Sequence, residues 1–423
     1  MALLAQRFGH HHPKGNAMKK LAVMLMGLVL GLAAVAQTSQ KVIKDPAEYN
    51  AYMAALNTTD PAAKAAAMEA FVAQYPNSVV KIDALEQAMA GYQQTGNAAK
   101  VETSAGRIVE LEPENVRALA ILAFLRRARA TQGDTKAGEE ALAYAQRGLQ
   151  ALPGWTKPAD MPQQDYDKLR QTMTSLLNGA AGFGRLQAKD YAGAREYYLK
   201  AVAADPSSLQ DVYQLGIAEL QMQPLDVNGF WYVARAMQLA GGNAAGRQSI
   251  EAYGKAKYRK YHGGTDGWDQ LVLAVASQSA PPADFAQSIK PAPTPAELAV
   301  QAVQQNDPAT LSFSDWEYIL QYRDASPANR EAAAKVWAVI QEKQQNGKAK
   351  LKLPMMVISA TQDTILGAIT EDNQASHTPD VKVILAKPLA HPPAAGAQIQ
   401  VIGVFTDYTP SPFLFTMRDG ELP

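Results

Sequence analysis

The spacing of small, aromatic and proline residues in the middle of the chain predicts packed pairs of helices. In the clearest unit, successive key residues lie 12, 4, 3 and 5 positions apart: Gly182, Ala194, Tyr198, Ala201 and Pro206. Small residues let two helices approach closely, the tyrosine ring fills the gap between them, and the proline ends the second helix. The glycine-rich string at 179–184 lies in a predicted helix with no strand before it. We therefore interpret it as close packing at Gly182 and not as a phosphate-binding loop.

This spacing resembles the tetratricopeptide repeat (TPR) in its small–small–aromatic–small–proline positions. Two residues depart from the family pattern, since Asn178 stands where the family usually has tryptophan and Ala181 where it has leucine. Related units recur with a period near 34 and end at prolines: Pro76, Pro113 and Pro153. Together they predict roughly five helix pairs between Asp45 and about Gly242, stacked into a curved superhelix. A helical bundle with coincidental spacing is the alternative.

The helix predicted after the repeats combines aromatic and basic side chains. Tyr253 and Tyr261 share one helical face, and Lys255 and Arg259 share another. These residues suggest either a cationic–aromatic patch for an anionic ligand or a capping helix with a packed aromatic face and a solvated basic face. We favour the capping helix.

The pattern changes again after residue 278. Five prolines between residues 279 and 295 predict a semi-rigid linker or an extended wrap. Capping boxes at Thr294–Glu297 and Ser314–Glu317 predict the next helices, and a third is expected from about Pro327 to Gln345. We therefore expect a helical connector over residues 296–347.

Residues 351–423 contain five short runs rich in β-branched and aromatic residues, separated by polar and proline-rich turns. They predict a small β domain. The order of the runs and a kink expected at Gly403 resemble the oligonucleotide/oligosaccharide-binding (OB) fold. A sandwich fragment or an open sheet is the alternative. The fold class expected for the chain is thus mainly α, a TPR-like superhelix over residues 45–278 followed by a small β-barrel.

The first 36 residues read as an upstream extension, before Met18, followed by the pattern of an export signal. Met18-Lys19-Lys20 precede an apolar run, Leu21–Leu32, and the cleavage pattern Ala34-Val35-Ala36 follows. We expect export to the periplasm or cell envelope with no stable membrane span after cleavage; an uncut anchor is the alternative. Whether Met1 or Met18 is the native start remains open. We assign no function to the histidines at positions 10–12.

Composition and charge exclude several classes of function. The 423 residues contain 40 basic and 40 acidic side chains and no cysteine, so disulfides, thiolate metal sites and cysteine nucleophiles are excluded. Residues 351–423 carry four basic and seven acidic side chains. Single-strand binders need a positive groove, so we predict no nucleic-acid partner.

We find no sequence motif for catalysis, and we predict no enzyme activity, no cofactor and no metal site. The histidines after the signal are widely separated: His262, His377 and His391. An unrecognised hydrolase would need His262 or His391 beside a carboxylate.

The expected function is a non-enzymatic scaffold that binds a protein or peptide segment, as the TPR resemblance implies. The alternative is a glycan-binding protein that uses the β-barrel and exposed aromatic residues. In TPR proteins the first helix of each pair usually supplies the ligand contacts. By matching position, the candidates are Arg126, Arg185 and Glu219, which we expect to be exposed. Tyr92 occupies the same position and is expected in the core.

Overall fold

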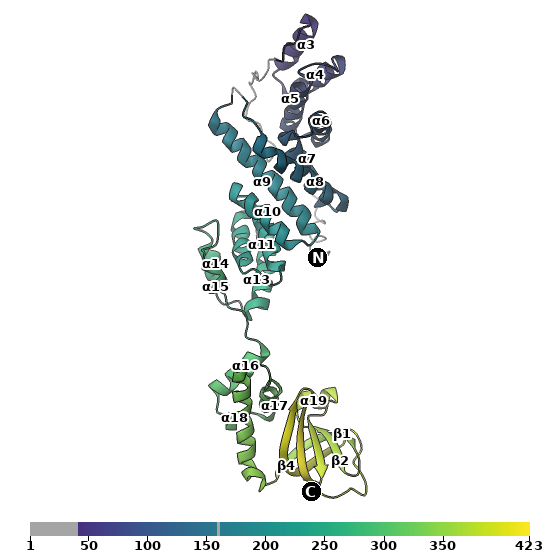
Figure 1. Cartoon of the computed structure of the whole chain (residues 1–423), viewed down its shortest axis with the longest axis vertical. Helices are drawn as coiled ribbons and strands as arrows, with labels where there is room; N and C mark the ends of the chain where they lie inside the picture. The colour runs from purple at the N-terminus through teal and green to yellow at the C-terminus, as the bar shows by residue number, and fades with distance from the viewer. Residues whose placement is uncertain (1–40, 159–160) are drawn as a thin grey trace. The chain divides into compact units, whose positions relative to one another are not determined.

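The computed structural model describes residues 41–158 and 161–423 (Figure 1). The predicted export signal lies outside these residues. The chain divides into two compact units between Lys290 and Pro291. In the described part, no helix combines the length and apolar character needed to span a membrane.

The first unit consists of helices that pack against their neighbours in sequence, and five of the expected helix pairs are present. The fold prediction of a mainly helical chain built from adjacent pairs is thereby confirmed. The pairs are α3 (Pro46–Leu56) with α4 (Pro61–Gln74), α5 (Lys81–Gln94) with α6 (Ala98–Leu111), α7 (Val116–Ala130) with α8 (Thr135–Ala151), α9 (Gln163–Gln187) with α10 (Tyr191–Ala204), and α11 (Leu209–Gln221) with α12 (Asn228–Leu239).

Side-chain caps fix where most of these helices begin. In each case an oxygen of the residue before the helix accepts a backbone N–H from the first turn, which otherwise lacks a partner. The capping residues of the repeat unit are Asp45, Asp60, Asn97, Asn115, Asp134, Asp190 and Ser208. Short turns between capped helices keep the two members of each pair together.

Close approach at glycine holds the pairs together as the sequence predicts. A Cβ added at Gly182 would lie 3.0 Å from the ring of Tyr198, which is fully buried. A Cβ at Gly216 would lie 3.0 Å from the carbonyl oxygen of Gly229 in the partner helix. Larger side chains at these positions would force the helices apart, because a packed core has no room to absorb them.

The unit ends in three further helices: α13 (Ala244–His262), α14 (Trp268–Ala274) and α15 (Phe285–Ser288). Tyr258 of α13 is buried against Phe230 and Trp268, as expected of a capping helix with a packed aromatic face. Phe285 contacts the ring of Trp231, with centroids 5.2 Å apart. The first part of the proline-rich segment therefore wraps onto the helical core.

The second unit contains α16 (Pro295–Gln305), α17 (Phe313–Gln321), α18 (Pro327–Lys343) and a closed barrel. Its strands follow the order β1-β2-β3-β5-β4, and all neighbours are antiparallel except β3 and β5. The expected small β-barrel is confirmed, with five strands in a closed sheet. The remaining elements are β1 (Leu351–Ala360), β2 (Thr364–Ala368), α19 (Glu371–Ser376), β3 (Val381–Leu385), β4 (Gln398–Pro410) and β5 (Phe413–Glu421).

Gly403 lies where the expected kink falls. The register between β4 and β5 shifts between Ile402 and Val404. A Cβ on Gly403 would lie 2.6 Å from Cγ of Met417 and 2.9 Å from the carbonyl oxygen of Arg418. Glycine is needed here because the neighbouring strand approaches the backbone too closely for any side chain.

The structure corrects two details of the connector. Helix α17 starts at a capping box of Ser312 with Asp315, not Ser314 with Glu317, because Ser312 has the extended backbone that a cap requires. The box of Thr294 with Glu297 is confirmed. Helices α16 to α18 do not build a core of their own: their buried residues join those of the barrel in one hydrophobic core.

Candidate functional site

The three predicted binding residues do not meet at one site, because each pairs with a residue close to it on a neighbouring helix or turn. Arg126 of α7 contacts Glu102 of α6 at 2.5 Å and Glu140 of α8 at 2.6 Å. Arg185 contacts Asp190, the cap of α10, at 3.2 Å. Their repeat position therefore faces the second helices, and ligand binding there stays a prediction.

Glu219 is the clearest departure from the expected exposure, since it is fully buried. The Nε of Arg195 lies 3.0 Å from its Oε1 and 3.2 Å from Asp226, so two carboxylates share one arginine. Burial, followed by the charge of Asp226, raises the pKa of Glu219 to about 8. The prediction of exposure is wrong here because α10 and α12 cover the position. Tyr92, expected in the core, is buried.

A different set of residues links the first helices of successive pairs. Nη1 of Arg127 in α7 lies 2.7 Å from Oδ1 of Asp211 in α11. The pair crosses α9 at Gly179, where an added Cβ would lie 2.6 Å from the same nitrogen. The guanidinium also lies 5.6 Å from the ring centre of Phe183. Helices α7, α9 and α11 thus meet at these residues on one side of the unit, and Arg127, Phe183 and Asp211 are buried there.

An ion pair extends this side to α5. Nη1 of Arg117 in α7 lies 3.7 Å from Oε2 of Glu86 in α5. Gln93, two helical turns after Glu86, belongs to the same side of α5. We call the whole set the first-helix face: Glu86, Gln93, Arg117, Arg127, Gly179, Phe183 and Asp211.

Several polar atoms of the first-helix face are buried without a hydrogen-bond partner. They are both amide atoms of Gln93, Nε of Arg117, and Nε and Nη2 of Arg127. Leaving such a group unpaired costs about 1–3 kcal/mol, and few are tolerated in a folded protein. Other described residues away from this face also hold buried polar atoms without a partner, among them Tyr198, Glu219 and Trp268.

The sequence offered little signal for these residues. Arg127 follows Arg126 directly, and one residue turns a helix by about 100°, so the two point to different neighbours. The one signal is Gly179, three residues before Gly182. A second glycine on the same helix leaves room for a long side chain from a neighbouring helix to pass across it.

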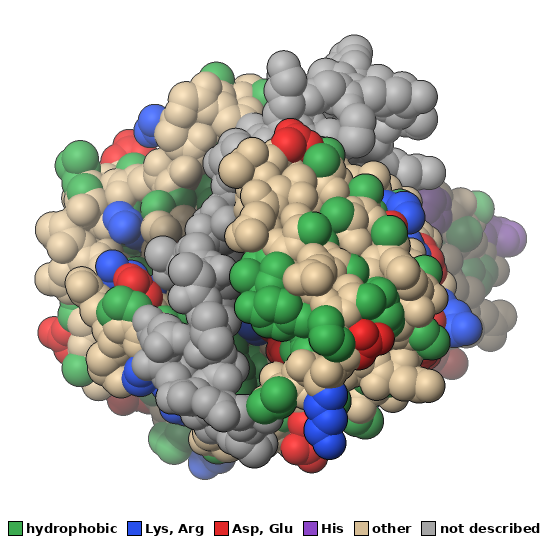
Figure 2. Space-filling model, turned by 90° about the horizontal axis from the view of Figure 1, so that it is seen from above, with side chains coloured by type: hydrophobic (Ala, Val, Ile, Leu, Met, Phe, Trp, Pro, Cys, Tyr) green, Lys and Arg blue, Asp and Glu red, His purple; other side chains and the backbone are tan. Residues whose placement is uncertain are grey.

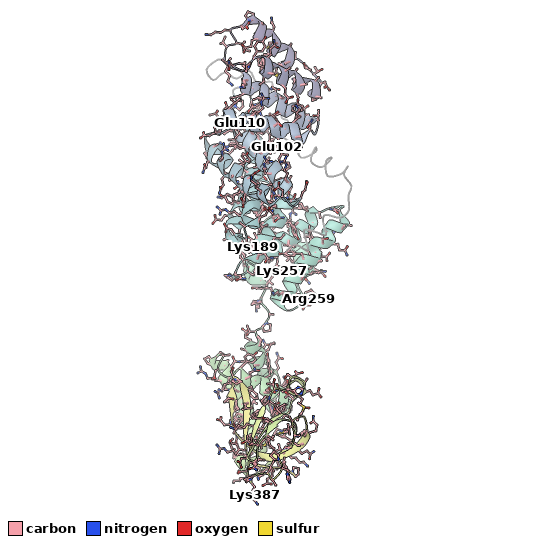
Figure 3. The ribbon with its side chains drawn as sticks, turned by 90° about the vertical axis from the view of Figure 1, so that its right-hand side faces the viewer. Glu102, Glu110, Lys189, Lys257, Arg259 and Lys387 are labelled. Atoms are coloured by element: carbon pink, nitrogen blue, oxygen red, sulfur yellow. The ribbon has the colours of Figure 1, made fainter. Side chains whose placement is uncertain are left out.

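On the face seen in Figure 2, basic and acidic side chains are interspersed and no continuous stripe of one sign is visible. On α13, Lys255 pairs with Glu251 at 2.8 Å, Nζ of Lys257 lies 5.9 Å from the ring centre of Tyr253, and Arg259 is exposed (Figure 3). Burial and the neighbouring Lys260 lower the pKa of Lys257.

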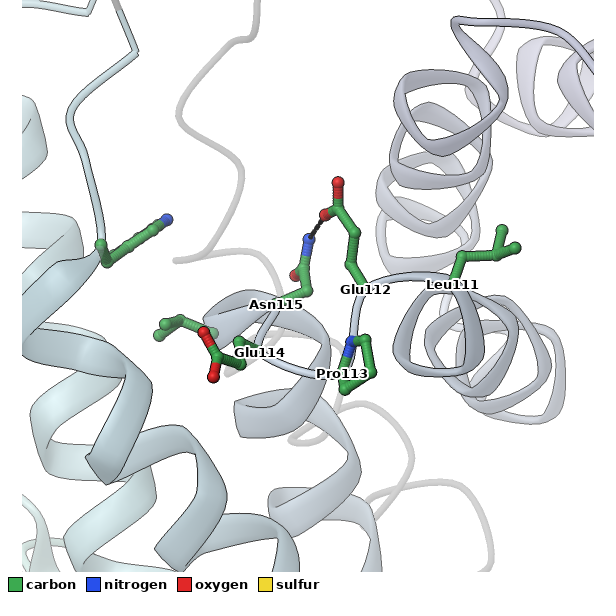
Figure 4. A pocket seen from close by; sticks show the side chains of 7 residues that line it. Leu111, Glu112, Pro113, Glu114 and Asn115 are labelled. Atoms are coloured by element: carbon green, nitrogen blue, oxygen red, sulfur yellow. Dashed lines mark hydrogen bonds between the residues drawn. The ribbon is translucent and has the colours of Figure 1, made fainter.

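A pocket of about 560 Å³ lies at the turn between α6 and α7 (Figure 4). Two short stretches of the chain build its wall. One is that turn, and the other is the loop after α8. The lining residues are Leu111, Glu112, Pro113, Glu114, Asn115, Val116 and Trp155.

The three histidines occupy separate elements. His262 contacts the carbonyl oxygen of Lys290 through Nδ1 at 2.7 Å, His377 ends α19, and His391 is exposed in a loop. In residues 41–158 and 161–423, no group of three or more histidine, aspartate and glutamate side chains is placed to hold a metal.

The aromatic residues of the barrel are buried. Phe405, Tyr408, Phe413 and Phe415 all belong to the core shared with α16 to α18. They pack against one another, with Phe405 and Phe415 ring centres 4.7 Å apart. Stacking on a sugar, which the glycan-binding alternative requires, would have to use other residues.

Comparison with protein-family models and with curated proteins finds no match for this chain.

Proposed function

We propose that this protein is an exported, non-enzymatic scaffold whose first unit is a TPR array that binds an extended protein or peptide segment. The array would place the first-helix face on its concave side, where stacked repeats present ligand surfaces. The basic, apolar and cleavage-site pattern of residues 18–36 supports export.

The unpartnered polar atoms of Gln93, Arg117 and Arg127 carry the proposal. An extended peptide offers a carbonyl and an N–H at each residue, and a glutamine amide can bond both. The arginine nitrogens are donors only, so they suit backbone carbonyls or carboxylates of the bound segment. Phe183 supplies apolar surface beside Arg127.

Site-specific photocrosslinking tests this function. A photoreactive phenylalanine replaces Phe124, which lies one turn before Arg127 on the same side of α7. The matched control carries the same group at Tyr197 of the second helix α10. We expect position 124 to crosslink one defined envelope protein, and Arg117→Gln to reduce that product. Equal products at both positions, or none at position 124, would refute the proposal.

A further inference from the structure

The pocket beside the turn between α6 and α7 combines an indole ring with carboxylates. Trp155 follows a short 3-10 turn, Leu152–Gly154, and is half-buried. The hydroxyl of Tyr166 in α9 donates to the carbonyl oxygen of Trp155, and the two rings lie 5.5 Å apart. Tyr166 of α9 therefore contacts both the backbone and the ring of Trp155, which places the indole beside α9.

Among the residues that the structure describes, Glu112 and Glu114 line the pocket and no lysine or arginine does. A cation does lie at its wall: Arg147 donates to the carbonyl oxygen of Pro113 at 2.9 Å. Oε2 of Glu112 accepts a hydrogen bond of 3.1 Å from Nδ2 of Asn115. Glu114 is exposed and, in the part of the chain that the structure describes, has no ion pair or hydrogen bond. Burial raises the pKa of nearby Asp83, the ion pair with Lys41 opposes this, and the charges of Glu86 and Glu112 add a smaller increase.

We infer that this pocket receives the side chain of an arginine or lysine from the bound segment. The cation would lie against the indole of Trp155 and pair with Glu112 and Glu114, which together favour a charged group. Leu111, which is 44 % exposed, and Pro113 would cover its aliphatic stem. The inference rests on the proposed function in that the cation belongs to a bound protein segment.

The pocket adjoins the first-helix face. Asn115 caps α7, and its Nδ2 also donates to Oε1 of Glu86 at 3.0 Å. Glu86 in turn pairs with Arg117 of the face. A segment lying along the face can therefore continue to the pocket without leaving the repeat unit. We expect the bound segment to carry a basic side chain at the end that reaches the pocket. The part that lies beside Arg117 and Arg127 should offer hydrogen-bond acceptors.

Fluorine NMR tests the pocket without the natural partner. The chain from residue 37 is labelled with 5-fluorotryptophan, and Trp155→Phe assigns the Trp155 resonance. The probes are acetyl-arginine methylamide and acetyl-citrulline methylamide, which share a shape but differ in charge. We expect a saturable shift with the arginine probe and binding about tenfold weaker with citrulline, the range of a partly desolvated cation–π contact and ion pair.

Matched variants decide the role of the carboxylates. Glu114→Gln should weaken arginine binding several-fold, whereas Glu110→Gln makes the same change on α6 outside the pocket and should leave binding unchanged (Figure 3). Both sites are exposed, and far-UV circular dichroism checks that the fold is intact. An equal response to both probes, an equal effect of both variants, or no shift would overturn the inference.

The two proposals fail separately. If crosslinking at position 124 captures a partner but the chemical shift of Trp155 does not change with the arginine probe, only the pocket assignment is refuted. If arginine binds and no partner crosslinks, the cation specificity of the pocket is kept, whereas the scaffold function and the bound segment as the source of the cation are refuted.

Discussion

Replacing Glu219 with glutamine should make the stability of the repeat unit less sensitive to pH. Glu219 is fully buried, its Oε2 has no hydrogen-bond partner, and its pKa in the folded protein is about 8, against an ordinary value of 4.5. Between these two values the folded protein keeps the proton and the unfolded chain releases it. The wild type therefore loses stability as pH rises from about 4.5 to 8 and is level above that.

The size of the effect follows from the pKa difference. A shift from 4.5 to about 8 corresponds to at most about 5 kcal/mol of unfolding free energy, at about 1.4 kcal/mol per pKa unit. The side chain of Arg195, the positive partner, is 33 % exposed and can adjust toward the carboxylate. We therefore expect Glu219→Gln to stabilise the protein by about 1–3 kcal/mol at pH 8.5 and to have little effect near pH 4.5.

Urea unfolding followed by far-UV circular dichroism at pH 5, 6.5 and 8.5 measures this difference, because most helices lie in the first unit. Glu196→Gln is the matched control, an exposed glutamate next to Arg195 on α10. Parallel stability curves for Glu219→Gln and wild type across this pH range would refute the assigned proton. A loss at every pH would mean that the ion pair with Arg195 is net stabilising.

Substitutions at three further positions test the packing. Asp211→Asn leaves the buried charge of Arg127 unpaired and should cost about 3–5 kcal/mol in urea unfolding, whereas a cost below 1 kcal/mol would mean that water compensates the arginine. Tyr198→Phe should be neutral because its buried hydroxyl has no partner, while Tyr198→Ala should cost about 3–5 kcal/mol; equal losses would contradict this reading. Gln344→Leu removes the bonds of 2.7 and 2.9 Å that Gln344 makes with the carbonyl and N–H of Phe405. It should cost about 2–3 kcal/mol and speed amide exchange in β4 by mass spectrometry, and unchanged exchange would count against it.

Helix pairs and strands could be read from the sequence because their signals are local. Gly182 and Tyr198 mark a contact within one pair, and the alternating runs after residue 351 mark strands with one buried face. The structure has both. The start of α17 was harder, since Ser312 and Ser314 both offer a capping pattern and only the backbone around Ser312 distinguishes them.

The burial of the charged residues and the choice of their ion-pair partners depend on the tertiary structure. Arg126 and Arg127 are adjacent, yet one pairs with neighbouring second helices and the other reaches across α9 to Asp211. Glu219 became buried through α10, which supplies Arg195. Such ion pairs depend on which helices pack side by side. The sequence of one helix does not show which side chains its neighbours place against it.

The sequence by itself thus determined the repeating architecture and the change from helices to a barrel, because turns, caps and periodicity act over a few residues. Only the tertiary structure decided the first-helix face, the shared core of α18 with the barrel, and the pocket at Trp155. Each of these joins segments distant in the chain, and the free energy that selects their contacts comes from burial and charge pairing between those segments.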